Sequence, residues 1–235
     1  STQSVLKLAA CIGNQFNLDT LAKINQKSQI ETAVDLWKAL LEEFIIPTTK
    51  IYNFFQSDLL NSQQLSAVHN YEEQKFSYRF LHDRVQQAAY ALIPDQEKQS
   101  THLKVGQLLL KNTSEKDIEE NIFEIVNQLN IGIDLITVQS EKYAVARLNL
   151  IAGSKAKSAT AYDAAFRYLK TGLSLLAADS WPHEYNLTLN LYVEAVEAAY
   201  LNIYPEQAIT YIEIVNKNAI SVLDEVQVYK KQMLM

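Results

Sequence analysis

The spacing of apolar residues divides the chain into a mixed N-terminal region and a long helical remainder. Apolar side chains first recur every three or four positions, which predicts three helices. These helices cover about residues 1–12, 17–24 and 29–44. Residues 75–80 alternate instead, with Phe76, Tyr78 and Phe80 on one face, as in a strand with one buried side. Helical spacing returns at Leu81 and continues to the end of the sequence.

Three helices followed by a β-hairpin is the order of a winged-helix domain. The first strand of the hairpin is predicted at 51–55, and the polar segment 61–73 is predicted to be the loop at its tip. The third helix is expected to carry residues 45–46 as an apolar tail. Its buried face is expected to comprise Ile30, Ala33, Leu36, Trp37, Leu40 and Leu41. We therefore expect residues 1–94 to form a winged-helix domain with a small β-hairpin.

After Pro94 the pattern predicts three pairs of helices and a last element that the sequence does not complete. The predicted segments are 102–111 with 118–129, 142–158 with 161–177, 183–201 with 204–219, and 226 onward. A shift of 43 residues superposes the second pair on the third. The matched residues are Leu148 with Leu191, Ala152 with Ala195, Ala156 with Ala199, Ala165 with Ala208, Tyr168 with Tyr211, and Leu169 with Ile212.

Small residues at one helix crossing and a large side chain on the partner helix are typical of close-packed αα repeats. We therefore expect residues 95–235 to form tetratricopeptide-like αα-hairpin repeats wound as a right-handed α-solenoid. The fold class expected for the whole chain is mainly α. Only five glycines and four prolines occur, which agrees with a fold that has few tight turns.

Composition and charge narrow the expected partners. The net charge is −6, which disfavours a nucleic acid or an anionic membrane as the main partner. The third helix, the reading helix of a DNA-binding winged helix, carries four acidic residues against one lysine. Phosphate contacts need lysine or arginine, so we expect no nucleic-acid partner. No apolar run approaches the ~18 residues of a membrane span, so we expect no membrane partner either.

The single cysteine, Cys11, lies in an apolar helical run and is predicted to be a buried small hydrophobe. One cysteine forms no intrachain disulfide framework and fits a reducing compartment. No secretory signal is recognisable, and the first residue is not Met. We therefore expect a cytoplasmic piece of a longer protein.

Signature motifs for catalysis are absent from the sequence. It contains no phosphate-binding glycine loop, no metalloprotease helix motif and no kinase signature set. His69, His102 and His183 are too scattered for a metal site, and His102 is predicted to face solvent. We therefore expect this chain not to be an enzyme, and to hold no cofactor or metal of its own.

His82 and Asp83 stand apart because they lie where the strand pattern gives way to the helical one. They have a structural interpretation, in which Asp83 caps the following helix and orients His82. A metal-dependent phosphohydrolase would need further His and Asp ligands that the sequence does not identify. A phospho-accepting histidine box reads His-Glu-x-Arg followed closely by Pro, whereas the next proline here is Pro94.

A further interpretation comes from resemblance. The run Phe-Leu-His-Asp-Arg-Val at 80–85 resembles the Met-His-Asp motif of signal-transduction ATPases with numerous domains, the STAND class. In that class the histidine contacts the β-phosphate of ADP bound by the preceding ATPase domain. The resemblance implies a nucleotide-sensing role for His82 and Asp83, with Leu81 in place of the methionine.

A broader resemblance covers most of the chain. Residues 80–94, 123–130 and 148–156 resemble large multi-domain sensor kinases that are common in cyanobacteria. These proteins combine a serine/threonine kinase, a P-loop ATPase, this region, a GAF domain and often a histidine kinase. The resemblance implies a non-catalytic region that couples the nucleotide state of an upstream ATPase domain, loaded with ADP or ATP and Mg, to partner binding.

The partners implied are that upstream ATPase domain and a protein or peptide ligand of the repeats. Candidate ligand-binding residues on the repeats are Tyr162, Arg167, Tyr192 and Tyr204. The alternative is a plain protein–protein interaction scaffold in which the winged helix only separates domains. Exposed aromatic side chains or a groove between the hairpins would favour that alternative.

Overall fold

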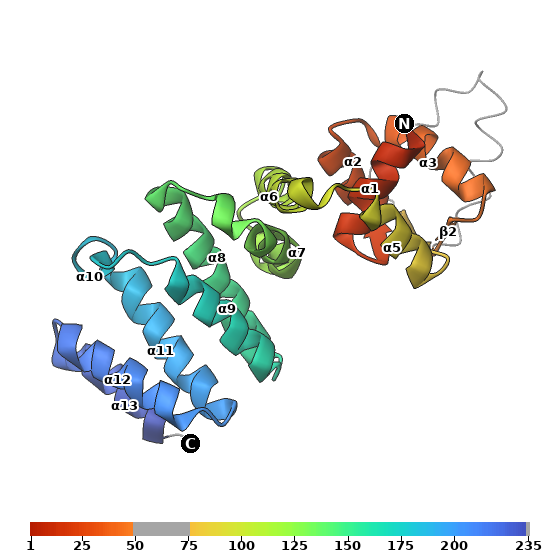
Figure 1. Ribbon diagram of the computed structural model, residues 1–235. Coiled ribbons are helices and arrows are strands. Elements are labelled where there is room, and N and C mark those ends of the chain that lie inside the picture. The colour runs from red at the N-terminus through yellow and green to blue at the C-terminus, as the bar shows by residue number, and fades with distance from the viewer. Residues whose placement is uncertain (49–75, 234–235) are drawn as a thin grey trace. The chain divides into compact units, whose positions relative to one another are not determined.

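A computed structural model describes residues 1–48 and 76–233, and the expected mainly helical class is confirmed (Figure 1). The chain divides into two compact units, Ser1–Asn112 and Thr113–Met235, each considered by itself below. The strand predicted at 51–55 and the loop predicted at 61–73 lie outside the described residues. None of the described helices is long and apolar enough to cross a lipid bilayer.

The first unit combines helices with a small antiparallel sheet. Its elements are α1 (Thr2–Ile12), β1 (Gln15–Asn17), α2 (Leu18–Asn25), α3 (Gln29–Leu41), β2 (Ile45–Pro47), β3 (Ser77–Phe80), α5 (Asp83–Ala91) and α6 (Asp95–Lys111). The predicted first two helices and the predicted strand are confirmed. Helix α6, which the sequence pattern grouped with the repeats, belongs to this unit and packs against α2. His102 of α6 is buried and its Nε2 lies 2.9 Å from the Tyr90 hydroxyl, so its expected exposure was wrong.

The sheet has the order β1-β3-β2, and β3 pairs antiparallel with both neighbours. The predicted alternation along β3 is confirmed, since Phe76, Tyr78 and Phe80 are all buried. Phe16 of β1 packs against this face, with its ring centroid 5.9 Å from that of Tyr78 and 5.7 Å from that of Phe80. These aromatic rings form one wall of the core of the first unit.

The third helix is shorter than predicted. It ends at Leu41, and Glu43 adopts a left-handed conformation with φ 56°. The amide of Phe44 then donates to the carbonyl of Ala39 at 2.9 Å, the closing bond of a Schellman motif. The Ile45-Ile46 pair that was expected to extend the helix lies in strand β2 instead. The reversal after α3 is therefore made without glycine, which is why the sequence pattern did not mark it.

The predicted buried face of α3 was partly wrong. Thr32, Leu36 and Ala39 are the buried residues, whereas Ile30 is 59% and Leu41 is 62% exposed. Apolar residues lie on more than one side of this helix, so their spacing alone does not define the face that packs on the core.

Helix α5 was likewise displaced by one position from its predicted face. Ala89 is buried, whereas Ala88, which the helical spacing favoured, is exposed. Ile93 is also buried in place of Leu92, which is 47% exposed.

The second unit consists of successive helices that lie side by side (Figure 1). They are α7 (Ile118–Ile131), η2 (Ile133–Leu135), α8 (Gln139–Ser158), α9 (Tyr162–Ser174), α10 (Ser180–His183), α11 (Tyr185–Leu201), α12 (Pro205–Asn218) and α13 (Val222–Met233). Each helix predicted in this part of the chain is present. Helix α11 contacts α8, α9, α12 and α13, which makes it the centre of the unit.

The predicted 43-residue correspondence is visible in the backbone. Thr160 after α8 and Ile203 after α11 both have φ 61°. The next amide in each case donates back to an alanine carbonyl at 2.9 Å, from Ala161 to Ala156 and from Tyr204 to Ala199. Both helices therefore end in the same Schellman motif before the chain turns into the next helix. All the matched residues except Tyr168, which is half-buried, are buried in the helical packing.

Two glycines allow the helices to approach closely. A Cβ atom at Gly153 of α8 would lie 2.6 Å from Leu169 Cγ of α9. A Cβ atom at Gly172 of α9 would lie 2.7 Å from Leu191 Cδ2 of α11. Both distances are shorter than any normal contact, so neither site accepts a larger side chain without displacing its neighbour.

Cys11 is buried in α1 as predicted, with 6% of its surface exposed. Burial raises the pKa of its thiol to about 11, which leaves the thiolate scarce at neutral pH. This environment is that of a packing residue and not of a nucleophile.

Replacing Gly153 by Val should lower the free energy of unfolding by about 2 kcal/mol, because the added methyl groups overlap Leu169. The matched control is Ala144→Val, the same β-branched residue at an exposed position on the same helix. Urea unfolding followed by circular dichroism measures both. Equal stabilities of the two variants would show that the α8–α9 crossing is not tightly packed.

Candidate functional site

A cavity of about 610 Å³ lies in the second unit among helices α8, α11 and α13. Leu150 from α8 and Val193 from α11 supply its apolar surface. The polar lining comes from Ser154 of α8, Asn190 and Glu194 of α11, and Gln227, Lys230 and Lys231 of α13. The cavity therefore combines a small apolar surface with hydroxyl, amide and charged groups from three helices.

The apolar surface follows from the helical repeat. Leu150 and Val193 are 43 residues apart, so they occupy corresponding positions on α8 and α11. Val193 is buried and Leu150 is half-buried. Equivalent positions on neighbouring repeats face the same side of an array, which brings the two side chains to one surface.

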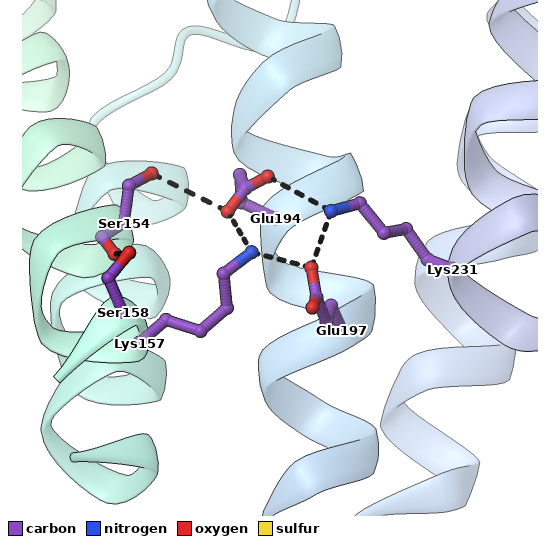
Figure 2. Close-up of polar contacts among 6 residues, drawn as sticks. All are labelled: Ser154, Lys157, Ser158, Glu194, Glu197 and Lys231. Atoms are coloured by element: carbon purple, nitrogen blue, oxygen red, sulfur yellow. Dashed lines mark hydrogen bonds and ion pairs between the residues drawn. The ribbon is translucent and has the colours of Figure 1, made fainter. Parts of the chain in front are cut away.

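A network of ion pairs adjoins the cavity and joins its three helices (Figure 2). Lys157 Nζ of α8 lies 2.5 Å from a carboxylate oxygen of Glu194 and of Glu197, both on α11. Lys231 Nζ of α13 lies 2.5 Å from Glu197 Oε2 and 3.6 Å from Glu194 Oε1. Ser154 Oγ also donates to Glu194 Oε2 at 3.5 Å.

The network is possible because Glu194 and Glu197 are three residues apart and share one face of α11. Two like charges at this spacing repel each other, and a lysine from each neighbouring helix offsets that repulsion. The four charged side chains are between 15% and 27% exposed, so solvent screens them only in part. The contacts therefore fix α8 and α13 against α11 more firmly than isolated surface pairs would.

Hydrogen bonding keeps two members of the network ionised. Burial alone would raise the pKa of Glu197, but the hydrogen bonds from Lys157 and Lys231 lower it below its usual value. Burial alone would lower the pKa of Lys231, but the hydrogen bond to Glu197 and the charges of Glu194 and Glu197 raise it above its usual value. Both groups therefore stay charged across the neutral range.

Lys230 differs from its neighbour Lys231. Its side chain is exposed at the cavity, and it forms no ion pair with the part of the chain that the structure describes. The two glutamates and two lysines of the network balance each other, so Lys230 leaves the cavity with one uncompensated positive charge. An ammonium group of this kind is suited to an anionic group on a ligand.

The carboxylates of this region are committed to lysine and do not form a metal centre. Among the described residues, no group of three or more His, Cys, Asp or Glu side chains lies together in a way that would hold a metal ion.

His82 and Asp83 lie at the strand-to-helix junction of the first unit, as predicted. His82 is the N-cap of α5, is exposed, and makes no side-chain capping hydrogen bond. Its carbonyl accepts from the amide of Val85 at 2.9 Å. The expectation that Asp83 caps the helix was wrong, because Asp83 is already the first helical residue. Its exposed carboxylate lies in the first turn, where a negative charge interacts favourably with the helix dipole.

The four predicted ligand-binding residues of the repeats do not line the cavity. Tyr192 is half-buried, with its ring centroid 5.7 Å from that of Trp181 and 5.6 Å from that of Tyr211. Burial raises the pKa of the Tyr192 hydroxyl. These ring contacts give Tyr192 a role in packing one helix against the next.

The other three predicted residues are spread over neighbouring surfaces. The Tyr204 ring packs on that of Phe166, with centroids 5.3 Å apart. The carbonyl of Tyr162 accepts from Asn202 Nδ2 at 2.7 Å. Arg167 is exposed and pairs with Asp163 one turn earlier at 2.9 Å. The structure does not bring these residues together, and their role in ligand binding stays a prediction.

Sequence reasoning missed the cavity and the ion-pair network, although two signals were available. The 43-residue shift that matched Leu148 with Leu191 also matches Leu150 with Val193. The Glu194–Glu197 spacing marks an acidic strip on a helix that is otherwise largely apolar. The lysines that neutralise this strip come from other helices, so their pairing required the tertiary structure.

Comparison with known proteins relates the chain to a signalling kinase. No protein-family model matches it, and no solved structure matches it. A curated relative, hybrid signal transduction histidine kinase G of Dictyostelium discoideum, is 31% identical over 235 aligned positions that cover 85% of this chain. The chain spans only about 7% of the length of that relative. The similarity thus concerns one region of a much longer kinase, and the predicted cyanobacterial origin stays a prediction.

Glu197→Gln should lower the free energy of unfolding at pH 7 by about 1 kcal/mol, because Lys157 and Lys231 lose a charged acceptor. The folded-state pKa of Glu197 is depressed, so its stabilisation is complete above the unfolded pKa of about 4.5. The stabilisation is lost as the pH falls through the folded pKa. Wild type and variant should therefore converge in stability in acid.

Urea unfolding at several pH values between neutral and acid measures this difference. Glu213→Gln on the exposed side of α12 is the matched control, and it should change stability little at any of these pH values. A gap between wild type and Glu197→Gln that stays constant down to about pH 3 would contradict the assigned linkage.

Proposed function

We propose that this chain is a non-catalytic regulatory region of a signal-transduction kinase, with a winged-helix first unit and tetratricopeptide-like hairpins in the second. The observation that carries this proposal is the 43-residue repetition of turn geometry and buried positions in the second unit. Repeats of this kind present extended binding surfaces and seldom contain catalytic groups. The similarity to a region of a histidine kinase gives the proposal its signalling context.

The arrangement of the first unit supports the winged-helix assignment. Three helices precede strand β3, and β3 lies between β1 and β2 in one antiparallel sheet. The acidic residues of α3 support a role other than DNA binding. Asp35 accepts from Lys27 at 2.6 Å and Glu31 closes the capping box with Ser28, so α3 offers few cations to a phosphate backbone.

The same repetition supports a right-handed α-solenoid for the second unit. In such an array α8 with α9 and α11 with α12 are successive hairpins, and α13 begins the next one. The ligand of the array is then a protein or peptide. A cytoplasmic location belongs to the same proposal.

The absence of catalytic motifs leads to a direct expectation. The purified chain, incubated with radiolabelled ATP and Mg, should acquire no label on itself or on a general protein substrate. A signalling kinase would carry its catalytic groups in other domains. Phosphotransfer that follows the purified chain through chromatography would contradict the non-catalytic assignment.

A second role, sensing the nucleotide state of an ATPase domain upstream of Ser1, is favoured by the geometry at His82. The imidazole is exposed and is not used to cap α5, so it remains available to a ligand supplied by another domain. The N-terminus of α5 adds a positive partial charge at the same place. A hydrogen bond from the imidazole to a diphosphate would contribute about 1.5–3 kcal/mol, equivalent to roughly tenfold to hundredfold in affinity.

In a longer protein that includes such an ATPase domain, His82→Ala should speed ADP release by at least about tenfold, because one phosphate contact is lost. Stopped-flow release of a fluorescent ADP analogue measures the rate. His183→Ala, which removes an exposed histidine from the second unit, is the matched control and should leave the rate unchanged. An unchanged rate in His82→Ala would favour the alternative of a plain interaction scaffold.

A further inference from the structure

The cavity of the second unit has the size and lining of a site for a short peptide. Its volume of about 610 Å³ lies within the range of about 300–1,000 Å³ that is usual for ligand pockets. This space accommodates a few side chains and excludes a folded domain. The apolar surface of Leu150 and Val193 is small, which suits one apolar side chain and not an extended lipid or a helix.

The polar lining matches the groups of a peptide backbone. Ser154 offers a hydroxyl, and Asn190 and Gln227 each offer an amide that both donates and accepts hydrogen bonds. They come from α8, α11 and α13 respectively, so a chain lying in the cavity would meet such a group from each helix. Paired donors and acceptors of this kind recognise main-chain N–H and C=O groups without demanding a particular sequence.

Charge selects the kind of peptide. Glu194 and Glu197 are satisfied by Lys157 and Lys231, and Lys230 is the lining cation that the network leaves uncompensated. A basic peptide would meet that ammonium and two carboxylates already paired with lysine, so it would gain little. A carboxylate on the ligand would gain a charge-assisted hydrogen bond. The local positive group also contrasts with the net charge of −6 of the whole chain.

We propose that the cavity among α8, α11 and α13 binds a short acidic peptide, with an apolar side chain on Leu150 and Val193 and a carboxylate at Lys230. The proposal rests on the proposed function and names the class of ligand that the repeats recognise. The ion-pair network then has a second consequence, because it sets the spacing of the three helices that the peptide contacts. Binding involves no covalent step.

The test uses the purified chain and three fluorescent peptide pools with random flanking residues. The first pool has Leu-Glu-Asp at its centre, the second has Leu-Gln-Asn, and the third has Ser-Glu-Asp. Fluorescence anisotropy should detect binding of the first pool at least about fivefold tighter than of the other two. Equal binding of the three pools, or no binding of any, would overturn the proposal.

Charge reversal locates the interaction. Lys230→Glu should weaken binding of the first pool by about tenfold, since it replaces attraction by repulsion at the cavity. Lys217→Glu is the matched control, because Lys217 is also an exposed lysine in the last turn of a helix but lies on α12. It should bind like wild type. Equal losses in both variants would mean that the overall field of the chain is responsible, and would overturn the assigned site.

A third variant separates loss of folding from loss of the site. Leu150→Asn removes the apolar contact and should weaken the first pool while the circular dichroism spectrum and urea midpoint stay near those of Lys217→Glu. Undiminished binding in the folded variant would overturn the placement of the apolar side chain. Absence of peptide binding by a chain that also lacks phosphotransfer would overturn this ligand class alone, whereas phosphotransfer would contradict the regulatory role itself.

Discussion

The close approach of helix backbones through alanine and glycine is the constraint on which the second unit depends. Ala152, Ala195 and Ala165 have no exposed surface, and Gly153 leaves no room for a Cβ atom beside Leu169. Small side chains at these crossings let one hairpin lie directly against the next. Because the same spacing recurs after 43 residues, the surfaces of successive helices also recur. The cavity is one product of that recurrence.

Structure and proposed function meet at the three helices α8, α11 and α13. Their packing places Leu150 beside Val193, and the network around Glu194 and Glu197 fixes the distance between the helices. The charges of the network are consumed by structure, so recognition depends on the group that remains, Lys230. The first unit contributes a different surface, the exposed N-terminus of α5. A regulatory region that receives one signal at each unit needs no catalytic group of its own.

The sequence predicted most helices, the central strand and the 43-residue repeat, because these depend on local periodicity and on small residues at fixed spacing. It failed where tertiary packing decides. The turn at Glu43 uses a left-handed residue that is not glycine, and the buried face of α3 is selected by its neighbours. The position of His82 was predicted correctly, whereas the capping role of Asp83 was not. The site at α8, α11 and α13 was missed because its charges come from three distant segments.

The most direct test of the central claim is a methyl NMR titration of the chain, labelled at Leu and Val, with the acidic peptide pool. The account predicts that the methyl signals of Leu150 and Val193 shift together and saturate at one affinity. The signals of Leu169, buried at the α8–α9 crossing, and of Val34, exposed on α3, should not move. Shifts at Val34 with none at Leu150 and Val193 would contradict the account, because the peptide would then bind the first unit.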